Sequence, residues 1–460
     1  MSSDAPDCAA GNSLDALGYK QELKRSLTLG GLFVYGLVLV VPIAPIAVFG
    51  IVFDASRGMV PLVYAIGLVA MLFTALSYMA MVREFPVAGS VYSYAARSLG
   101  PTVGFFAGWA ILLDYLLVPT VTYVACAIAV HAALPSVPQA VWVVVLLGLA
   151  TTVNYYGIST TARISLIMLA LQIVILAIFF AVAIPALIHH VDGARLSLTP
   201  LYDRSQLTPP IVFGALSLAV VSFLGFDAIS TLTEESRGGW APVARATMLT
   251  LCASALLFML QAYVASLFVL GRTSFAPGDP SNAAFYNIAA SIGGYWLKTL
   301  LAIPGVVFSA FASAVTAQAA TARLLFGMAR DGKLPRALAH VSETSKVPDR
   351  SIFLVAGVTL VLGLLMVSQF ELLTSMVSFG ALVGFLLLHA SVVVHFVWRR
   401  KSRNWLRHLV APAVGFCIIA YVLWNAQANA KIAGVCWLSA GVLVLVALRR
   451  RSGAAALPVE

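Results

Sequence analysis

The stretch FLGFDAISTLTEE, residues 223–235, places an aspartate inside a run of apolar residues. Residues 210–226 carry no charge, and Asp227 follows them directly, two positions after Gly225. An acidic side chain in such a run indicates a buried functional site, because a carboxylate in an apolar environment is unfavourable unless it is paired or protonated. The sequence around this run decides what kind of protein the chain forms.

The composition is that of a membrane protein. Hydrophobic residues make up 61% of the chain and charged residues 10%, whereas a soluble domain contains about 25% charged residues. Several uncharged runs reach the roughly 20 residues that a helix needs to cross a bilayer. The clearest are 29–53, 58–82, 164–188, 246–271, 299–321 and 372–394, and weaker or interrupted ones lie near 102–130, 139–161, 210–233, 351–370, 408–430 and 432–448. We therefore predict an all-α polytopic membrane protein with about twelve transmembrane helices.

The net charge of +10 raises the alternative of a nucleic-acid surface. If the loops alternate from a cytoplasmic N-terminus, 22 of the 28 Lys and Arg residues fall on the cytoplasmic side and 6 on the other. The positive-inside rule predicts this bias. The membrane topology therefore explains the excess of basic residues, and a nucleic-acid partner is not required. Membrane lipids are the expected surroundings, and both termini are predicted to be cytoplasmic.

The predicted organisation is one transmembrane domain between two short tails. Residues 1–27 are polar and acidic and do not have the pattern of a cleavable signal. The transmembrane domain covers 28–450, with one repeat at about 28–190, a second at about 205–400 and helices 11 and 12 at about 408–450. Residues 451–460 form the second tail.

The sequence offers no pattern for cofactor chemistry. The five cysteines, of which Cys8 lies in the first tail, have neither disulfide nor metal-ligand spacing. No nucleophile–base pattern and no phosphate-binding loop are present. We therefore expect no metal, no cofactor and no enzymatic activity.

Two of the predicted spans contain helix breakers near their middle. The first has Pro42 and Pro45 in VVPIAPIAVFG, and proline removes an amide donor and clashes with the preceding turn. The sixth has Ser222, Gly225 and Asp227. Two interrupted helices five spans apart indicate a 5+5 inverted repeat with broken helices 1 and 6, as in secondary transporters. The alternative is ordinary kinks in a packed bundle.

Further polar residues lie inside predicted spans. Asp114 is about ten residues into the third span, roughly 15 Å along a helix, and so near the bilayer midplane. Such a carboxylate generally marks a pathway or relay, although a structural hydrogen bond is the alternative. Glu234 and Glu235 lie close to Arg237, which favours a structural ion pair. His389 is expected to have a hydrogen-bond partner rather than to face a cavity.

Several motifs resemble one family, the amino acid–polyamine–organocation permeases. REFPVAGSVYSYAARSLG (83–100) resembles the loop after their second helix, GWAILLDYLL (108–117) their third helix, and ATARLLFGMARDGKLP (320–335) the end of their eighth. FLGFDAISTLTEE resembles their sixth. VPIAPIAVFGIV (41–52) and HFVWRRK (395–401) are most similar to bacterial putrescine importers. The resemblance implies a twelve-helix fold in a bacterial inner membrane, with substrate held between broken helices 1 and 6 and often proton-coupled.

The resemblance also implies roles for individual residues. Asp227 stands where related carriers have an acidic residue that binds a cation or a proton. Where amino-acid permeases have a glycine-rich break, this chain has Pro42, Ile43 and Ala44, which favours an amine without a carboxylate. Putrescine importers carry an aspartate at the position of Ala47, and its absence here removes a second ammonium partner. Gln172 replaces the helix-5 lysine of some relatives, so a lysine switch is not expected.

We therefore predict a secondary transporter that imports an organic amine, putrescine or a related polyamine, by proton symport. An amino-acid permease or exchanger of the same fold is the first alternative, and a channel or sensory membrane protein is the second. The oligomeric state stays open. The predicted substrate-binding residues are Asp227, Gly225, Ser222, Phe223, Phe226, Pro42, Ile43, Ala44 and Tyr115. The predicted proton-coupling residues are Asp114, Glu84 and Asp227.

Overall fold

The computed structural model describes residues 25–87, 90–133, 136–156, 158–276, 281, 283–332, 334–367, 370–426 and 428–454. These residues fold into helices, and their only β-structure is an isolated bridge between Leu27 and Ser236. Most of the two predicted tails, including Cys8, lies outside the described residues.

Each uncharged run of the sequence coincides with one helix or with consecutive helices. In chain order they are α2 (Leu29–Val40) with α3 (Ala44–Ser56), α4 (Val60–Glu84), α6 (Pro101–Ala133), α7 (Gln139–Tyr155), α8 (Ile158–Ile188), α9 (Pro209–Ala219) with η2 (Val220–Phe223) and η3 (Asp227–Glu235), α10 (Trp240–Leu267), α13 (Tyr295–Leu300) with η4 (Leu301–Gly305) and α14 (Val306–Arg330), α15 (Asp349–Leu365), α16 (Phe370–Val392) with η6 (Val393–Arg399), η7 (Leu406–Val410) with α17 (Ala411–Trp424), and α18 (Ala428–Ala454). The connections contain the short helices α5 (Ser90–Leu99), η1 (Val191–Gly193), α12 (Ala284–Gly293) and η5 (Arg336–Ala339).

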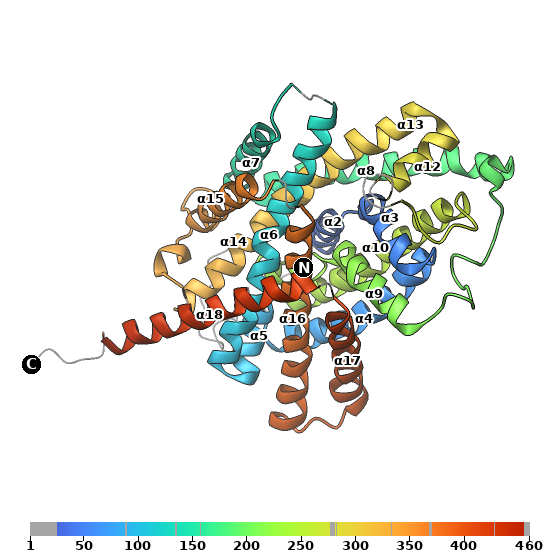
Figure 1. Cartoon of the computed structure of the whole chain (residues 1–460). Helices are drawn as coiled ribbons and strands as arrows, with labels where there is room; N and C mark the ends of the chain where they lie inside the picture. The colour runs from blue at the N-terminus through green and yellow to red at the C-terminus, as the bar shows by residue number, and fades with distance from the viewer. Residues whose placement is uncertain are drawn as a thin grey trace, which may run out of the picture.

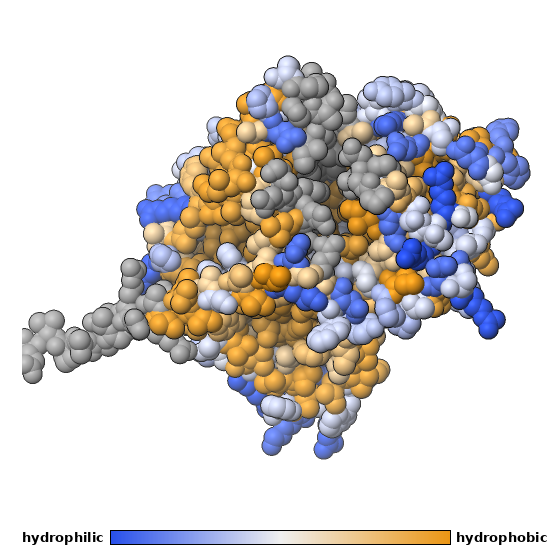
Figure 2. Space-filling view, in the orientation of Figure 1, coloured by the Kyte–Doolittle hydropathy of each residue, from blue (hydrophilic) through white to orange (hydrophobic). Residues whose placement is uncertain are grey.

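The helices form a bundle whose outer faces are apolar. Eight of the described helices are long and apolar enough to cross a membrane, and the bent pair α2–α3 makes nine. Figure 2 shows apolar side chains over the outside of α16 and α17 and hydrophilic ones at the end of this pair. Large exposed apolar residues such as Leu149, Leu365 and Leu443 suit lipid rather than water. The prediction of an all-α polytopic membrane protein is confirmed.

The first span is broken between α2 and α3, which lie near the middle of the bundle (Figure 1). The two halves meet at an angle of 44°, and Val41 between them has a φ of 56°. Pro42 lies in the break, and its carbonyl accepts a hydrogen bond from Gln261 Nε2 of α10 at 2.8 Å. Pro45 lies in the first turn of α3, where proline is well tolerated. Pro42, and not the pair of prolines, therefore occupies the interruption.

This placement makes Pro42→Ala a test of the break. Proline inside a helix is disfavoured by about 3 kcal/mol, and its removal should let α2 and α3 join into a regular helix. We expect uptake of substrate to fall at least about tenfold while the amount of protein in the membrane is unchanged. Pro45→Ala is the matched control and should keep wild-type uptake. Equal uptake by the two variants would contradict a functional role of the break.

The sixth span is broken at the predicted glycine. The 3₁₀ segment η2 ends at Phe223, Leu224 is extended, and Gly225 has a φ of 110° before η3 begins at Asp227. A Cβ atom on Gly225 would lie 2.9 Å from Leu39 Cβ and 3.0 Å from the carbonyl carbon of Leu39. The two breaks therefore pack against each other with almost no side chain between them, which only glycine permits at this φ.

One side of these breaks is bounded by α6, which packs along α16. Gly380 of α16 faces the α6 backbone, where a Cβ atom would lie 2.7 Å from the carbonyl oxygen of Ala110 and 2.9 Å from the amide nitrogen of Asp114. The N-terminal part of α6 is held by α18. The indole nitrogens of Trp109 and Trp437 each donate a hydrogen bond to the other residue's carbonyl, at 2.8 and 2.7 Å. These contacts fix the position of Asp114 and Tyr115.

Candidate functional site

Asp227 is fully buried and accepts several hydrogen bonds from neighbouring elements. The Tyr115 hydroxyl of α6 donates to Oδ2 at 2.7 Å, and the Tyr78 hydroxyl of α4 donates to the same oxygen at 3.4 Å. The backbone N–H of Gly225 donates to Oδ1 at 3.2 Å. The acid therefore ties the break in the sixth span to α4 and α6. Sequence reasoning selected Tyr115 but missed Tyr78, which looks like an ordinary packing aromatic near the end of an apolar run.

Asp114 lines a cavity of about 20 Å³ together with Tyr115 and Gly225. Its side chain is buried, and none of the described residues donates a hydrogen bond to Oδ1. Packing of α6 thus brings Asp114 to the break in the sixth span. The other lining residues are small or apolar: Leu39, Val118, Leu224, Ala228, Ala317 and Ala320. Sequence reasoning missed these, since such residues carry no chemical signal.

Three other candidates in the sixth span face neighbouring helices rather than this cavity. Ser222 shares a hydrogen bond of 3.0 Å with the Tyr64 hydroxyl, and Phe223 packs on the Tyr64 ring. Phe226 packs against the rings of Tyr78 and Phe385. These contacts fix the segment on either side of Gly225.

The candidates of the first span, Pro42, Ile43 and Ala44, form the junction between α2 and α3 and do not line the described cavity. Ala47 lies on an exposed face of α3. Gln172 is buried in α8, away from the cavity lining.

Glu84 is separated from the two aspartates. It lies at the end of α4, where it pairs with Arg400 and where its Oε1 is 3.2 Å from His395 Nε2. Its side chain is about a quarter exposed, at 23%. The structure thus brings Asp114, Tyr115, Gly225 and Asp227 together and leaves Glu84 in a charged cluster elsewhere.

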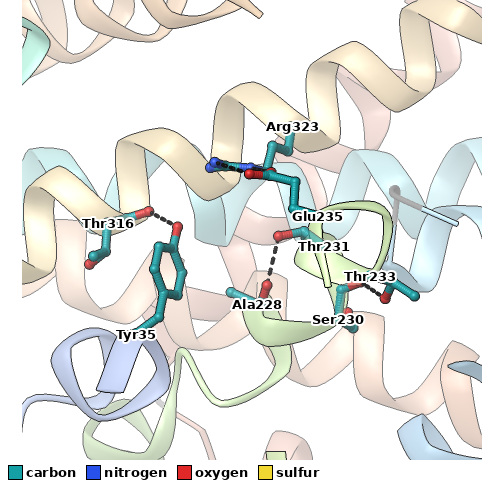
Figure 3. A network of polar contacts seen from close by, with 8 residues as sticks. All are labelled: Tyr35, Ala228, Ser230, Thr231, Thr233, Glu235, Thr316 and Arg323. Carbon is teal, nitrogen blue, oxygen red and sulfur yellow. Dashed lines mark hydrogen bonds and ion pairs between the residues drawn. The ribbon is translucent and has the colours of Figure 1, made fainter. Parts of the chain in front are cut away.

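A second buried polar network joins the end of η3 to α14 (Figure 3). Glu235 forms a bidentate ion pair with Arg323, with Arg323 Nη2 at 3.3 Å from Glu235 Oε2. Glu234 is bound by both terminal nitrogens of Arg330, at 2.9 and 3.1 Å. In the same network the Tyr35 hydroxyl of α2 donates to the Thr316 carbonyl at 2.8 Å.

The predicted structural role of these glutamates is therefore supported, but the expected partner is wrong. Arg237 is exposed, and its backbone N–H donates to the Leu27 carbonyl. The partners come from α14, which lies far away in the sequence and is brought to η3 only by folding.

His389 of α16 has the hydrogen-bond partners that the sequence led us to expect. Its Nδ1 lies 2.9 Å from Ser77 Oγ and its Nε2 lies 3.3 Å from Thr74 Oγ1, both on α4. This histidine joins two helices and does not line the cavity.

The arrangement around Asp114 and Asp227 suits a cation. Asp114 lines the cavity, and Asp227 lies beside it, bound to the lining residue Tyr115. The described lining contains no lysine or arginine. Both side chains are buried. Buried carboxylates need a counter-charge or a proton. Within the described residues, no group of three His, Cys, Asp or Glu side chains could hold a metal ion.

Comparison with known proteins gives a consistent result. A family model described as "Amino acid permease" matches residues 31–448. The low-affinity putrescine importer PlaP of Escherichia coli K12 is 31% identical over 93% of this chain and 94% of its own length. The branched-chain amino acid permease BcaP of Bacillus subtilis is 24% identical over 84% of this chain and 85% of its own. The methylthioribose transporter of Bacillus subtilis is 25% identical over 94% of each.

Proposed function

This chain belongs to the amino acid permease family, and on that premise we propose that it imports an organic amine, putrescine or a related polyamine, by proton symport. As a family member it is a multi-pass membrane permease for amino acids or polyamines, and it is not an enzyme. The narrower proposal places it in a bacterial inner membrane with both termini in the cytoplasm. Its substrate is a small organic cation, and its coupling ion is the proton.

The observation that carries this proposal is the pair of buried acids beside the two breaks. Asp227 is partly stabilised by two hydroxyls and one N–H, whereas Asp114 Oδ1 has no donor among the described residues. The C-terminal end of α2 adds the negative end of a helix dipole next to Leu39, a lining residue. Both features favour a positively charged substrate.

The break in the first span also disfavours a substrate carboxylate. Amino-acid carboxylates are held by free backbone N–H groups at the start of a half-helix. Here Pro42 has no N–H, the N–H of Val41 donates to the Leu37 carbonyl at 3.0 Å, and that of Ala44 donates to the Val41 carbonyl at 2.8 Å. Few donors remain for a carboxylate, which favours an amine over an amino acid.

Proton coupling follows from the same acids. When no amine is bound, a proton is the simplest way to neutralise a buried carboxylate. An ammonium group and a proton then compete for the same oxygens, which links substrate occupancy to protonation. Asp114 and Asp227 are the residues proposed for this step. Glu84 is also proposed for proton coupling, although Arg400 already pairs with its charge.

The test is uptake of labelled putrescine into proteoliposomes that contain the purified protein. We expect uptake to increase when the outside is acidic relative to the lumen, and unlabelled amines to compete better than arginine or neutral amino acids. Equal competition by amino acids would identify an amino-acid permease. Uptake that does not depend on the proton gradient but requires an amine inside the proteoliposomes would identify an exchanger.

A change at Ala47 should have little effect on selectivity. Ala47 is exposed on α3 and lies outside the described cavity lining, so Ala47→Asp adds an acid that the bound amine does not meet. Exposed substitutions usually change free energies by less than about 0.5 kcal/mol, and we expect the ratio of putrescine to butylamine inhibition constants to change by less than about twofold. A markedly improved preference for putrescine would show that position 47 meets the second ammonium group.

A further inference from the structure

We infer that Asp114 and Asp227 together bind one diamine, with each carboxylate holding one of its two ammonium groups. This inference rests on the proposed function and makes Asp114 a residue that determines specificity. The first span has no acid in its break, so the second anchor comes instead from α6.

The two acids reach the site from different directions. Asp114 and Tyr115 are consecutive in α6, and consecutive side chains leave a helix about 100° apart. Tyr115 reaches Asp227 with its hydroxyl, at 2.7 Å, while Asp114 lines the cavity itself. The two carboxylates therefore come from different elements, α6 and η3, and Asp114 is the one that lines the cavity.

The two carboxylates differ in the hydrogen bonds that they accept. Asp227 accepts three hydrogen bonds and sits behind Tyr115 and Gly225, which both line the cavity. Asp114 Oδ1 accepts none from the described residues. A buried carboxylate oxygen that has no donor can accept a hydrogen bond from an ammonium group without losing an existing hydrogen bond. The second ammonium group reaches Asp227 by replacing the Tyr115 hydroxyl, which exchanges a neutral hydrogen bond for a charged one.

The rest of the lining fits a hydrocarbon chain. Leu39, Val118, Ala317 and Ala320 offer apolar surface and no hydrogen-bonding side chain. A polymethylene chain with an ammonium group at each end has the same polarity pattern as this lining, apolar between acids, and the cavity must widen to hold it. Arg323, three residues after the lining residue Ala320 in α14, is bound to Glu235 and does not neutralise the acids. A dication thus balances both charges.

The experiment compares a diamine with a monoamine of the same length. Inhibition constants of putrescine and butylamine are measured by competition with uptake of labelled putrescine. Binding of each amine to the purified protein is measured separately by thermal shift. We expect Asp114→Asn to weaken the binding of putrescine at least about 30-fold. This factor corresponds to the about 2 kcal/mol that the loss of a desolvated charge pair costs. The binding of butylamine, which needs only one carboxylate, should weaken far less. Asp203→Asn removes a carboxylate in the loop between α8 and α9, where it binds Ser205, and is the matched control with no expected change.

Each outcome is decisive. Equal weakening of both amines by Asp114→Asn would overturn the inference, and so would a loss of proton-driven accumulation with unchanged selectivity. A wild-type protein that binds no amine would instead overturn the proposed function. If Asp114→Asn does not fold, Asp114→Glu keeps the charge, and a retained preference for diamines over butylamine in that variant supports the inference, while its loss contradicts it.

Discussion

Asp227→Asn should weaken binding of a cationic amine by at least about 30-fold, and uptake should fall with it. The substitution keeps the shape of the side chain, and the hydroxyls of Tyr115 and Tyr78 can still donate to the amide oxygen. What is lost is the negative charge that meets the ammonium group, together with the acceptor of the Gly225 N–H. Removing one partner of a desolvated charge pair costs about 2–5 kcal/mol, and each 1.4 kcal/mol changes affinity about tenfold.

The same variant should be no less stable than wild type when no substrate is present, because a buried carboxylate has been replaced by a neutral group. Substrate-dependent thermal shift and uptake, measured side by side, separate the two effects. The exposed-loop variant Asp203→Asn serves as the control for a change of one charge. A mutant that binds the amine as tightly as wild type would make Asp227 a structural residue.

Arg323→Gln should be the most destabilising of the changes considered. Arg323 and Glu235 are both buried, and the pair joins η3 to α14 (Figure 3). Removing the guanidinium leaves the Glu235 carboxylate buried without its partner, which typically costs about 3–5 kcal/mol. The melting temperature of the purified protein should fall sharply, and less protein should reach the membrane.

The double variant Arg323→Gln/Glu235→Gln removes both charges and should recover much of the lost stability. Arg237→Gln, at an exposed position next to the same segment, should change stability by less than about 0.5 kcal/mol. If the double variant is as unstable as Arg323→Gln alone, the ion pair is not what holds the two segments together.

Much of the fold could be predicted from the sequence, because long uncharged runs have one stable solution in lipid, the helix. The positions of both breaks were also readable, since Pro42 and Gly225 are residues with restricted or unusual backbone conformations. The resemblance predicts a loop within residues 83–100, where the structure has the short helix α5. It carries polar residues such as Arg97 among buried ones, so it does not appear as an uncharged run.

The site was predicted less completely. Asp227 and Tyr115 were selected together, and the structure joins them by a hydrogen bond. The place of Asp114 in the same cavity, the role of Tyr78 and the pairing of Glu235 with Arg323 depend on packing between distant helices. Periodicity along one chain contains no information on which faces of two helices meet.

The contact between α6 and α16 has a consequence for the size of substrate that the site can admit. Gly380 leaves no space between the two backbones, and Gly384 sits equally close to the Ile111 side chain, where a Cβ atom would lie 2.9 Å from Cδ1. This side of the cavity is a fixed wall. A cavity of about 20 Å³ holds a water molecule but not a diamine, so the extra volume must come from the other lining elements, which are α2, α14 and the segment around Gly225. The upper limit on substrate length is then set by how far these elements separate from α6.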